Sequence, residues 1–156
     1  MKTLIIYTSK TGTTEKCAKK LSAALKSETR LLKLRDAAKE NLGAYDAIIF
    51  GSYIHIGKVP SKLQKFIGKH PELMEKKLGL FLCMGDTAEK LDEYLANNFN
   101  ERFLNHCSVK GYFGGEFNFE KMGFVIRKMI KKMSEGKELP SVKVENIESF
   151  ARKFEG

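Results

Sequence analysis

Short apolar runs alternate along this chain with segments of helical pattern, and this alternation constrains the fold more than any other feature. The apolar runs cover residues 3–7, 30–34, 46–52, 78–84 and 107–115. Helical patterns lie near residues 14–26, 60–69, 86–104 and 145–154. Because the apolar runs are continuous, they suit strands covered on both faces, as in a parallel sheet between two layers of helices. The sequence therefore predicts an α/β fold with a doubly wound, five-stranded parallel sheet.

Composition narrows the class of protein. No Pro/Gly-rich linker or internal repeat divides the chain, so we expect a single domain over residues 1–156. No apolar run approaches the roughly 20 residues that span a bilayer, and the first ten residues lack a signal-peptide cleavage site, so we expect a cytoplasmic protein. The three cysteines, Cys17, Cys83 and Cys107, form no CxxC pair, which favours reduced thiols over a zinc site or a disulfide framework.

The net charge of +9 attracts anions without selecting one. No nucleic-acid recognition motif accompanies this charge, so we do not expect nucleic acid as a partner.

The segment "TSKTGTTE", residues 8–15, follows the first apolar run and opens the first helical pattern. Backbone N–H groups at a helix N-terminus favour an anion, and hydroxyls of Ser9, Thr11, Thr13 or Thr14 would add donors. The GxGxxG and GxxxxGK[ST] nucleotide motifs are absent, so this loop would bind a phosphate in another way. The alternative is that Thr13 or Thr14 merely caps the helix, with Gly12 easing the turn.

A strand followed by "TSKTGTTE" resembles the FMN phosphate loop of flavodoxins, with its T/S-x-T-G-x-T pattern. The resemblance implies strand order 2-1-3-4-5, with FMN as cofactor at the point where the strand order reverses. It places Ser9, Thr11 and Thr14 at the hydroxyl positions of the motif. It places Lys10, Gly12 and Thr13 at the positions that donate backbone N–H groups.

The resemblance also assigns two later loops to the flavin ring. In "GSYIHIGKV" the expected cofactor-binding residues are Ser52, Tyr53, Ile54, His55, Ile56 and Gly57. Gly57 would let the backbone turn close to the ring, and His55 is a weak candidate for proton transfer. Ordinary loop packing is the alternative for Tyr53 and His55.

In "CMGDTAEKL", Met84, Gly85 and Asp86 would meet the other edge of the ring. Asp86 precedes a helical pattern and stands three residues before Glu89, so capping that helix is the favoured role for its carboxylate.

Two features depart from a flavodoxin carrier. Such carriers are usually acidic, whereas this chain is basic. Residues 114–140 exceed the minimal fold, and there Met122, Val125, Ile126, Met129 and Met133 share one helical face. Arg127, Lys128 and Lys131 lie opposite them. This basic amphipathic segment either packs on the domain or serves as a lid or a contact with an anionic membrane surface.

With this insertion and "GSYIHIGKVPSKLQKFI", the chain resembles the flavodoxin-fold, menaquinone-dependent protoporphyrinogen oxidase family. That resemblance implies an FMN-dependent dehydrogenase of heme biosynthesis, with protoporphyrinogen IX as substrate and a quinone as electron acceptor. Arg127, Lys128, Lys131 and Lys132 would then contact the substrate or the inner face of the membrane. Two alternatives stay open: a flavodoxin-type electron carrier acting on a redox-protein partner, and a flavin-dependent quinone reductase using a nicotinamide donor.

Overall fold

The computed structural model contains a five-stranded, all-parallel sheet with the order β2-β1-β3-β4-β5. It describes residues 1–116, 123–133, 135–136 and 139–156. The strands are β1 (Lys2–Tyr7), β2 (Glu28–Lys33), β3 (Ala47–Tyr53), β4 (Lys77–Cys83) and β5 (Cys107–Tyr112). The predicted fold class and strand order are therefore confirmed.

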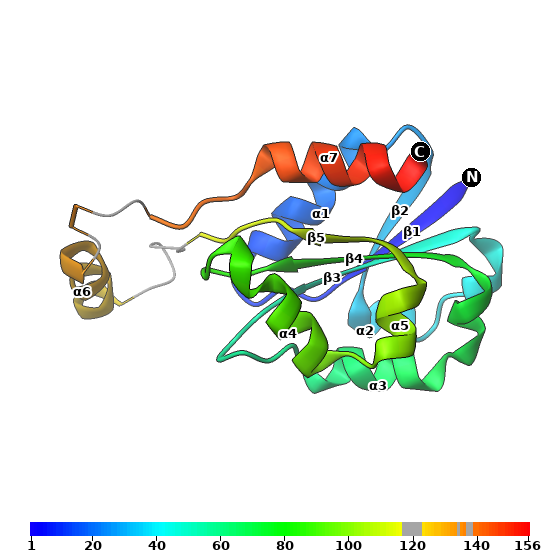
Figure 1. Ribbon diagram of the computed structural model, residues 1–156, viewed down its shortest axis with the longest axis horizontal. Coiled ribbons are helices and arrows are strands. Elements are labelled where there is room, and N and C mark those ends of the chain that lie inside the picture. Colours follow the sequence, from blue (N-terminus) through cyan, green and yellow to red (C-terminus); the bar gives the residue numbers. More distant parts are fainter. Residues whose placement is uncertain (117–122, 134, 137–138) are drawn as a thin grey trace.

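Helices cover both faces of this sheet, as Figure 1 shows. The α-helices of the described residues are α1 (Thr13–Ala24), α2 (Leu34–Ala37), α3 (Ser61–Lys69), α4 (Leu91–Asn98), α5 (Glu101–His106), α6 (Phe124–Met133) and α7 (Val144–Glu155). Helices α1 and α7 pack on one face, and α2 to α5 lie on the other.

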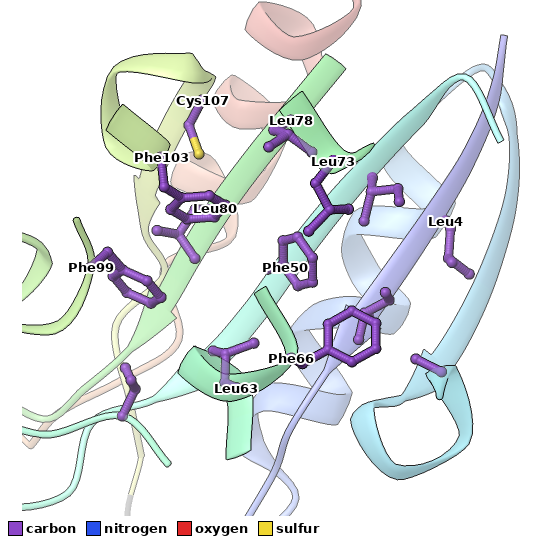
Figure 2. Close-up of a cluster of buried hydrophobic side chains, with 14 of the residues drawn as sticks. Leu4, Phe50, Leu63, Phe66, Leu73, Leu78, Leu80, Phe99, Phe103 and Cys107 are labelled. Carbon is purple, nitrogen blue, oxygen red and sulfur yellow. The ribbon is translucent and has the colours of Figure 1, made fainter. Parts of the chain in front are cut away.

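The strands supply two separate cores because successive side chains point to opposite faces. In β1, Leu4 and Ile6 join the cluster on the side of α3, whereas Ile5 and Tyr7 join the cluster under α1 and α7. Figure 2 shows the first cluster, in which the Phe50 ring meets the edges of the Phe66 and Phe103 rings at centroid distances of 6.1 Å. These two buried layers fix the sheet and thereby the positions of the loops at its ends.

The expected helix over residues 86–104 is interrupted. A 3₁₀ turn, Ala88–Lys90, leads into α4, and α5 begins only at Glu101. The physical reason is local: the Asn100 side chain accepts a hydrogen bond from the N–H of Phe103 at 2.7 Å and so caps a new helix. The short helix α2 lies within no predicted element.

The insertion after β5 leaves and returns beside the carboxyl end of β4. Gly114 and Val142 form an antiparallel bridge at its base, and the N–H of Met84 donates to the carbonyl of Gly114 at 2.8 Å. In Figure 1, α6 stands clear of the sheet, beyond the carboxyl ends of the strands. The insertion therefore lies at the end of the molecule where loops from β1, β3 and β4 meet.

Candidate flavin site

The loop after β1 turns tightly into α1 through Gly12. Gly12 has φ 96° and is the N-cap of α1, and no side chain makes a capping hydrogen bond there. The hydroxyl of Ser9 accepts a hydrogen bond from the Gly12 N–H at 3.1 Å, which closes the loop. The alternative in which Thr13 or Thr14 caps the helix is therefore wrong, since both are already helical.

The start of α1 offers donors to an anion. Among the described residues, no hydrogen bond uses the N–H groups of Thr13, Thr14 or Glu15, as expected for the first turn of a helix. The side chains of Thr13 and Thr14 are buried, and the hydroxyls of Thr11 and Thr13 lie 3.5 Å apart. A helix dipole, free N–H groups and clustered hydroxyls together suit one terminal phosphate.

The loop after β3 is a two-residue hairpin. His55 and Lys58 pair in an antiparallel bridge, and the two residues between them, Ile56 and Gly57, have φ 49° and 72°. Positive φ at both positions is the geometry of a type I′ turn. Ile56 is 88% exposed at the tip of this hairpin. The predicted turn at Gly57 is thus present, with Ile56 sharing its unusual conformation.

A buried asparagine that the sequence analysis did not single out holds this hairpin. The Asn98 side chain accepts from the N–H of Val59 at 3.0 Å and donates to the carbonyl of Gly57 at 3.0 Å. Its Nδ2 also donates to the carbonyl of Tyr94 at 2.8 Å. Asn98 ends α4, so the hairpin is fixed to that helix.

The loop after β4 differs from its predicted detail at Asp86. The following turn begins after Thr87, with no side-chain cap, and the Asp86 carboxylate accepts a hydrogen bond from the Tyr94 hydroxyl instead. The capping role predicted for Asp86 is therefore wrong. The Tyr112 hydroxyl donates to the Asp86 carbonyl at 2.9 Å, so two tyrosines hold this loop in place.

A cavity of about 180 Å³ lies where the three loops meet. Nine of its lining residues belong to the predicted set: Lys10, Thr11, Thr13, Thr14, Tyr53, Ile54, His55, Met84 and Gly85. The other predicted residues do not line it: Ser9, Gly12, Ser52, Ile56, Gly57 and Asp86. Ser52 is fully buried, and its hydroxyl donates to the Tyr53 carbonyl at 3.0 Å. It therefore lies inside the strand.

Four further residues line the cavity that the sequence did not indicate: Cys83, Gly115, Glu116 and Pro140. Gly115 and Pro140 come from the two ends of the insertion, which the bridge at its base brings beside the β4 loop. The Glu116 carboxylate pairs with Lys16 at 3.3 Å. No local sequence motif indicates that Gly115, Glu116 and Pro140 line the cavity, because their positions depend on where the insertion returns to the sheet.

Cys83 lies beneath the cavity against Cys17 of α1. A hydrogen bond between the two thiols, together with burial, holds the pKa of the Cys83 thiol well above its usual range. Cys83 therefore presents a neutral thiol to the cavity. Burial also raises the pKa of Cys107 to about 12, so this third cysteine is likewise neutral and lies away from the site, at the start of β5.

The four cationic residues assigned to substrate or membrane contact lie on α6, separate from the cavity. On the helical wheel Arg127, Lys128 and Lys131 lie away from Val125 and Met129, whereas Lys132 lies beside Val125 at the edge of the apolar side. The apolar side is not packed on the domain, since Val125 is 70% and Met129 57% exposed. Met122, which the sequence assigns to the same face, lies outside the described residues. The alternative in which this stripe packs on the domain is thus not found for Val125 and Met129.

Comparison with known proteins places the chain in a family. The model of the flavodoxin domain family matches residues 4–142. A flavodoxin of Clostridium saccharobutylicum is 33% identical over 124 residues, covering 74% of each chain. An Escherichia coli protein named protoporphyrinogen IX dehydrogenase (quinone) is 26% identical over 177 residues, covering 99% of this chain and 94% of the relative.

Solved structures agree on the fold. A short-chain flavodoxin associated with a PDU bacterial microcompartment has a TM-score of 0.62 at 13% identity, covering 99% of this chain and 96% of its own. A flavodoxin of Streptococcus pneumoniae has a TM-score of 0.59 at 15% identity, covering 99% and 98%. A Fusobacterium nucleatum flavodoxin bound to flavin mononucleotide has a TM-score of 0.51 at 16% identity, covering 76% and 71%.

The residues present fit the group that such a family implies. The first turn of α1 carries the buried hydroxyls of Thr13 and Thr14 beside N–H groups with no partner among the described residues, which suits one phosphate. A side chain at Gly12 would meet nothing within 4 Å, so open space adjoins the loop. From its sequence, its strand order and this loop, the chain belongs to the flavodoxin domain family.

Proposed function

We propose that this protein is an FMN-dependent oxidoreductase that oxidises protoporphyrinogen IX to protoporphyrin IX and passes the electrons to a quinone. FMN is the cofactor that membership of the flavodoxin family and the phosphate-binding geometry of α1 together support. Bound FMN supplies the electron-accepting centre. The residues of the chain provide binding, orientation and exclusion of water.

Different residues around the cavity would bind the phosphate, enclose the ring and transfer the proton. The loop before α1 and the first residues of that helix, from Ser9 to Thr14, would hold the phosphate through N–H groups and hydroxyls. Tyr53 and Ile54 on one side and Met84 on the other would enclose the ring, and these largely apolar walls would exclude water. His55 lines the cavity and is exposed. In the proposed reaction His55 would pass a proton between solvent and a bound substrate.

The choice of substrate rests on how much of this chain aligns with the Escherichia coli protein named protoporphyrinogen IX dehydrogenase. That relative aligns with 99% of this chain, so the insertion after β5 lies within the matched length. The flavodoxin relative aligns with 74%. The insertion also adds Gly115, Glu116 and Pro140 to the cavity wall, which links it to the flavin site.

An electron carrier is the second candidate function. It is favoured by the higher identity of the match to the Clostridium saccharobutylicum flavodoxin, 33% against 26%. The net charge of +9 argues against an electron carrier that serves a partner with a basic docking surface, because like charges repel across an interface. A carrier of this charge would serve acidic redox proteins.

Helix α6 supports a peripheral contact with an anionic membrane. It exposes Phe124, Val125 and Met133 as well as its basic face. In the part of the chain that the structure describes, no helix is long and apolar enough to cross a membrane. Basic amphipathic helices bind anionic interfaces by combining burial of apolar side chains with electrostatic attraction. Such a contact would bring the flavin site near membrane quinone.

Anaerobic addition of protoporphyrinogen IX to the FMN-loaded protein tests the proposal. We expect loss of the oxidised-flavin absorbance at a rate well above that of free FMN at the same concentration, and its return on addition of a menaquinone analogue. The His55→Ala variant should react more slowly if His55 moves the proton. A flavin that dithionite reduces but protoporphyrinogen IX leaves oxidised would favour the carrier.

A further inference from the structure

A second and larger hollow lies on the other side of the phosphate loop. It has a volume of about 880 Å³ and runs between α3, the start of α2 and the loop after β1. This groove and the flavin cavity share two lining residues, Lys10 and Tyr53, and Ser9 and Gly12 of the phosphate loop also line the groove. The groove thus adjoins the flavin site but is largely built from other residues. Its volume is within the range of sites that bind small molecules.

The groove is lined by six lysine and arginine side chains and by a single carboxylate. Its cationic lining residues are Lys10, Lys33, Arg35, Lys62, Lys65 and Lys69. Among the described residues, none of the six forms an ion pair. The one carboxylate in the lining is Glu15, which already accepts from the Tyr7 hydroxyl at 3.1 Å and pairs with Lys19 at 3.6 Å. A cleft lined by one sign of charge concentrates ligands of the opposite sign.

The sequence of α3 arranges part of this charge in a row. Lys62, Lys65 and Lys69 stand at positions i, i+3 and i+7 of the helix, so they share one face and extend over about 10 Å along its axis. Phe66 lies between them and is nearly buried, and Leu34 of α2 also lines the groove. Figure 1 shows α2 and α3 on the same side of the sheet. The groove therefore combines a cationic wall with apolar surface.

We infer that this groove binds a small polyanion with an apolar body. Two or more carboxylate or phosphate groups of the ligand meet the lysines of α3 and the cations of β2 and α2. The apolar body lies toward Tyr53, the residue that the groove shares with the flavin cavity. That the bound molecule exchanges electrons with the flavin rests on the proposed function, whereas its binding does not. A dicarboxylate tetrapyrrole has this chemistry, and a nicotinamide dinucleotide shares its polyanionic part, with aromatic base rings in place of the apolar body.

Binding to the FMN-loaded protein tests the inference, with three probes measured by equilibrium dialysis at low salt. The probes are protoporphyrin IX, its dimethyl ester and NADPH. The test variant carries Lys62→Gln, Lys65→Gln and Lys69→Gln. The control carries Lys20→Gln, Lys26→Gln and Lys153→Gln, which remove the same charge from exposed positions on and beside α1 and α7.

We expect the test variant to bind protoporphyrin IX or NADPH about tenfold more weakly than the wild type, and the control to bind within about twofold. The charged probe that responds identifies the ligand class, and the neutral ester should bind poorly to all three proteins. Retention of FMN by both variants, read from its absorbance, keeps this result separate from a failure of the proposed function.

Three outcomes would overturn the inference. One is equal weakening in both variants, which would assign the effect to net charge alone. Another is that protoporphyrin IX and its dimethyl ester bind equally well and that the test variant binds NADPH and protoporphyrin IX as tightly as the wild type. The third is failure of both charged probes to bind, together with lysine-dependent binding of an acidic redox protein, because the groove would then be a protein docking surface.

Discussion

Thr14 joins the phosphate loop to the floor of the flavin cavity, because its side chain is buried at the start of α1 and lines that cavity. Replacing Thr14 by Val keeps the shape and removes the hydroxyl. We expect FMN binding to weaken by about 1–3 kcal/mol, the contribution of one hydrogen bond to a charged group. Titration of the apoprotein with FMN measures this, with Thr29→Val on β2 as the control. Unchanged affinity would remove the Thr14 hydroxyl from the phosphate site.

Ile56 is the one non-glycine residue with positive φ in the described part of the chain. A β-branched side chain at φ 49° costs on the order of 1–3 kcal/mol, and at 88% exposure Ile56 gains little from burial. We expect Ile56→Asn to stabilise the apoprotein by about 1 kcal/mol, because Asn tolerates this conformation.

The same substitution should weaken FMN binding if Ile56 covers the ring. Urea denaturation of the apoprotein and flavin titration separate the two effects. If the variant apoprotein is no more stable than the wild type, the positive φ of Ile56 does not destabilise the fold measurably.

Residues that act through neighbours in sequence were predictable. Ser9, Thr11, Gly12 and Thr14 stand close together in the sequence, so their spacing alone predicts a phosphate site there, and the binding of phosphate by these residues stays a prediction. Asn98 and Glu116 act across the fold, on residues 41 and 100 positions away. No periodicity or motif marks such contacts, because they depend on how helices and the insertion dock on the sheet.

At the scale of elements, the strands were predicted more closely than the helices. Continuous apolar runs follow from burial on both faces of a parallel sheet, and each predicted run overlaps a strand. The sequence predicted one helical segment over residues 86–104, but α4 ends at Asn98 and α5 begins at Glu101. The helical spacing of apolar residues does not reveal this break. Only the capping hydrogen bond of Asn100 shows where one helix ends and the next begins.

The end of α7 is joined to the segment after α1 by one carboxylate. Glu155 accepts hydrogen bonds from the N–H groups of Lys26 at 3.0 Å and Ser27 at 2.8 Å. Burial acts to raise the pKa of Glu155, but these two hydrogen bonds outweigh it and hold the pKa below its ordinary value of 4.5. A carboxyl with a lowered pKa stabilises the fold above that value, and this stabilisation disappears as pH falls through the lowered pKa.

We therefore expect Glu155→Gln to destabilise the protein near neutral pH by about 1 kcal/mol, a value reduced by exposure to solvent. The difference from the wild type should shrink as pH falls below 4.5. Urea denaturation across this range measures it, with Glu148→Gln on the same helix as the control. A difference that does not change with pH would show that the charge of Glu155 contributes nothing.

At the scale of the whole molecule, α6 stands clear of the sheet, beyond the carboxyl ends of its strands. A variant with Arg127, Lys128, Lys131 and Lys132 all changed to Gln should keep its fold and its FMN, because none of the four lines the cavity. It should lose binding to anionic vesicles, since each cation near such a surface contributes about 1 kcal/mol. Vesicle sedimentation at low and at physiological salt measures the loss.

The matched control removes three lysines and one arginine elsewhere, through Lys20→Gln, Lys26→Gln, Arg152→Gln and Lys153→Gln. Salt should weaken wild-type binding. Vesicle binding by the α6 variant equal to that of the wild type would leave α6 without a role at the membrane.

The central claim is that the loop from Ser9 to Thr14 holds the phosphate of FMN, and comparing flavins that differ in that phosphate tests it most directly. Calorimetric titration of the apoprotein with FMN, riboflavin and FAD gives the three dissociation constants. The account predicts tight binding of FMN and much weaker binding of riboflavin, which lacks the phosphate, and of FAD, whose phosphate is esterified to an adenylate and is therefore not terminal. Equal affinity for FMN and riboflavin would contradict it.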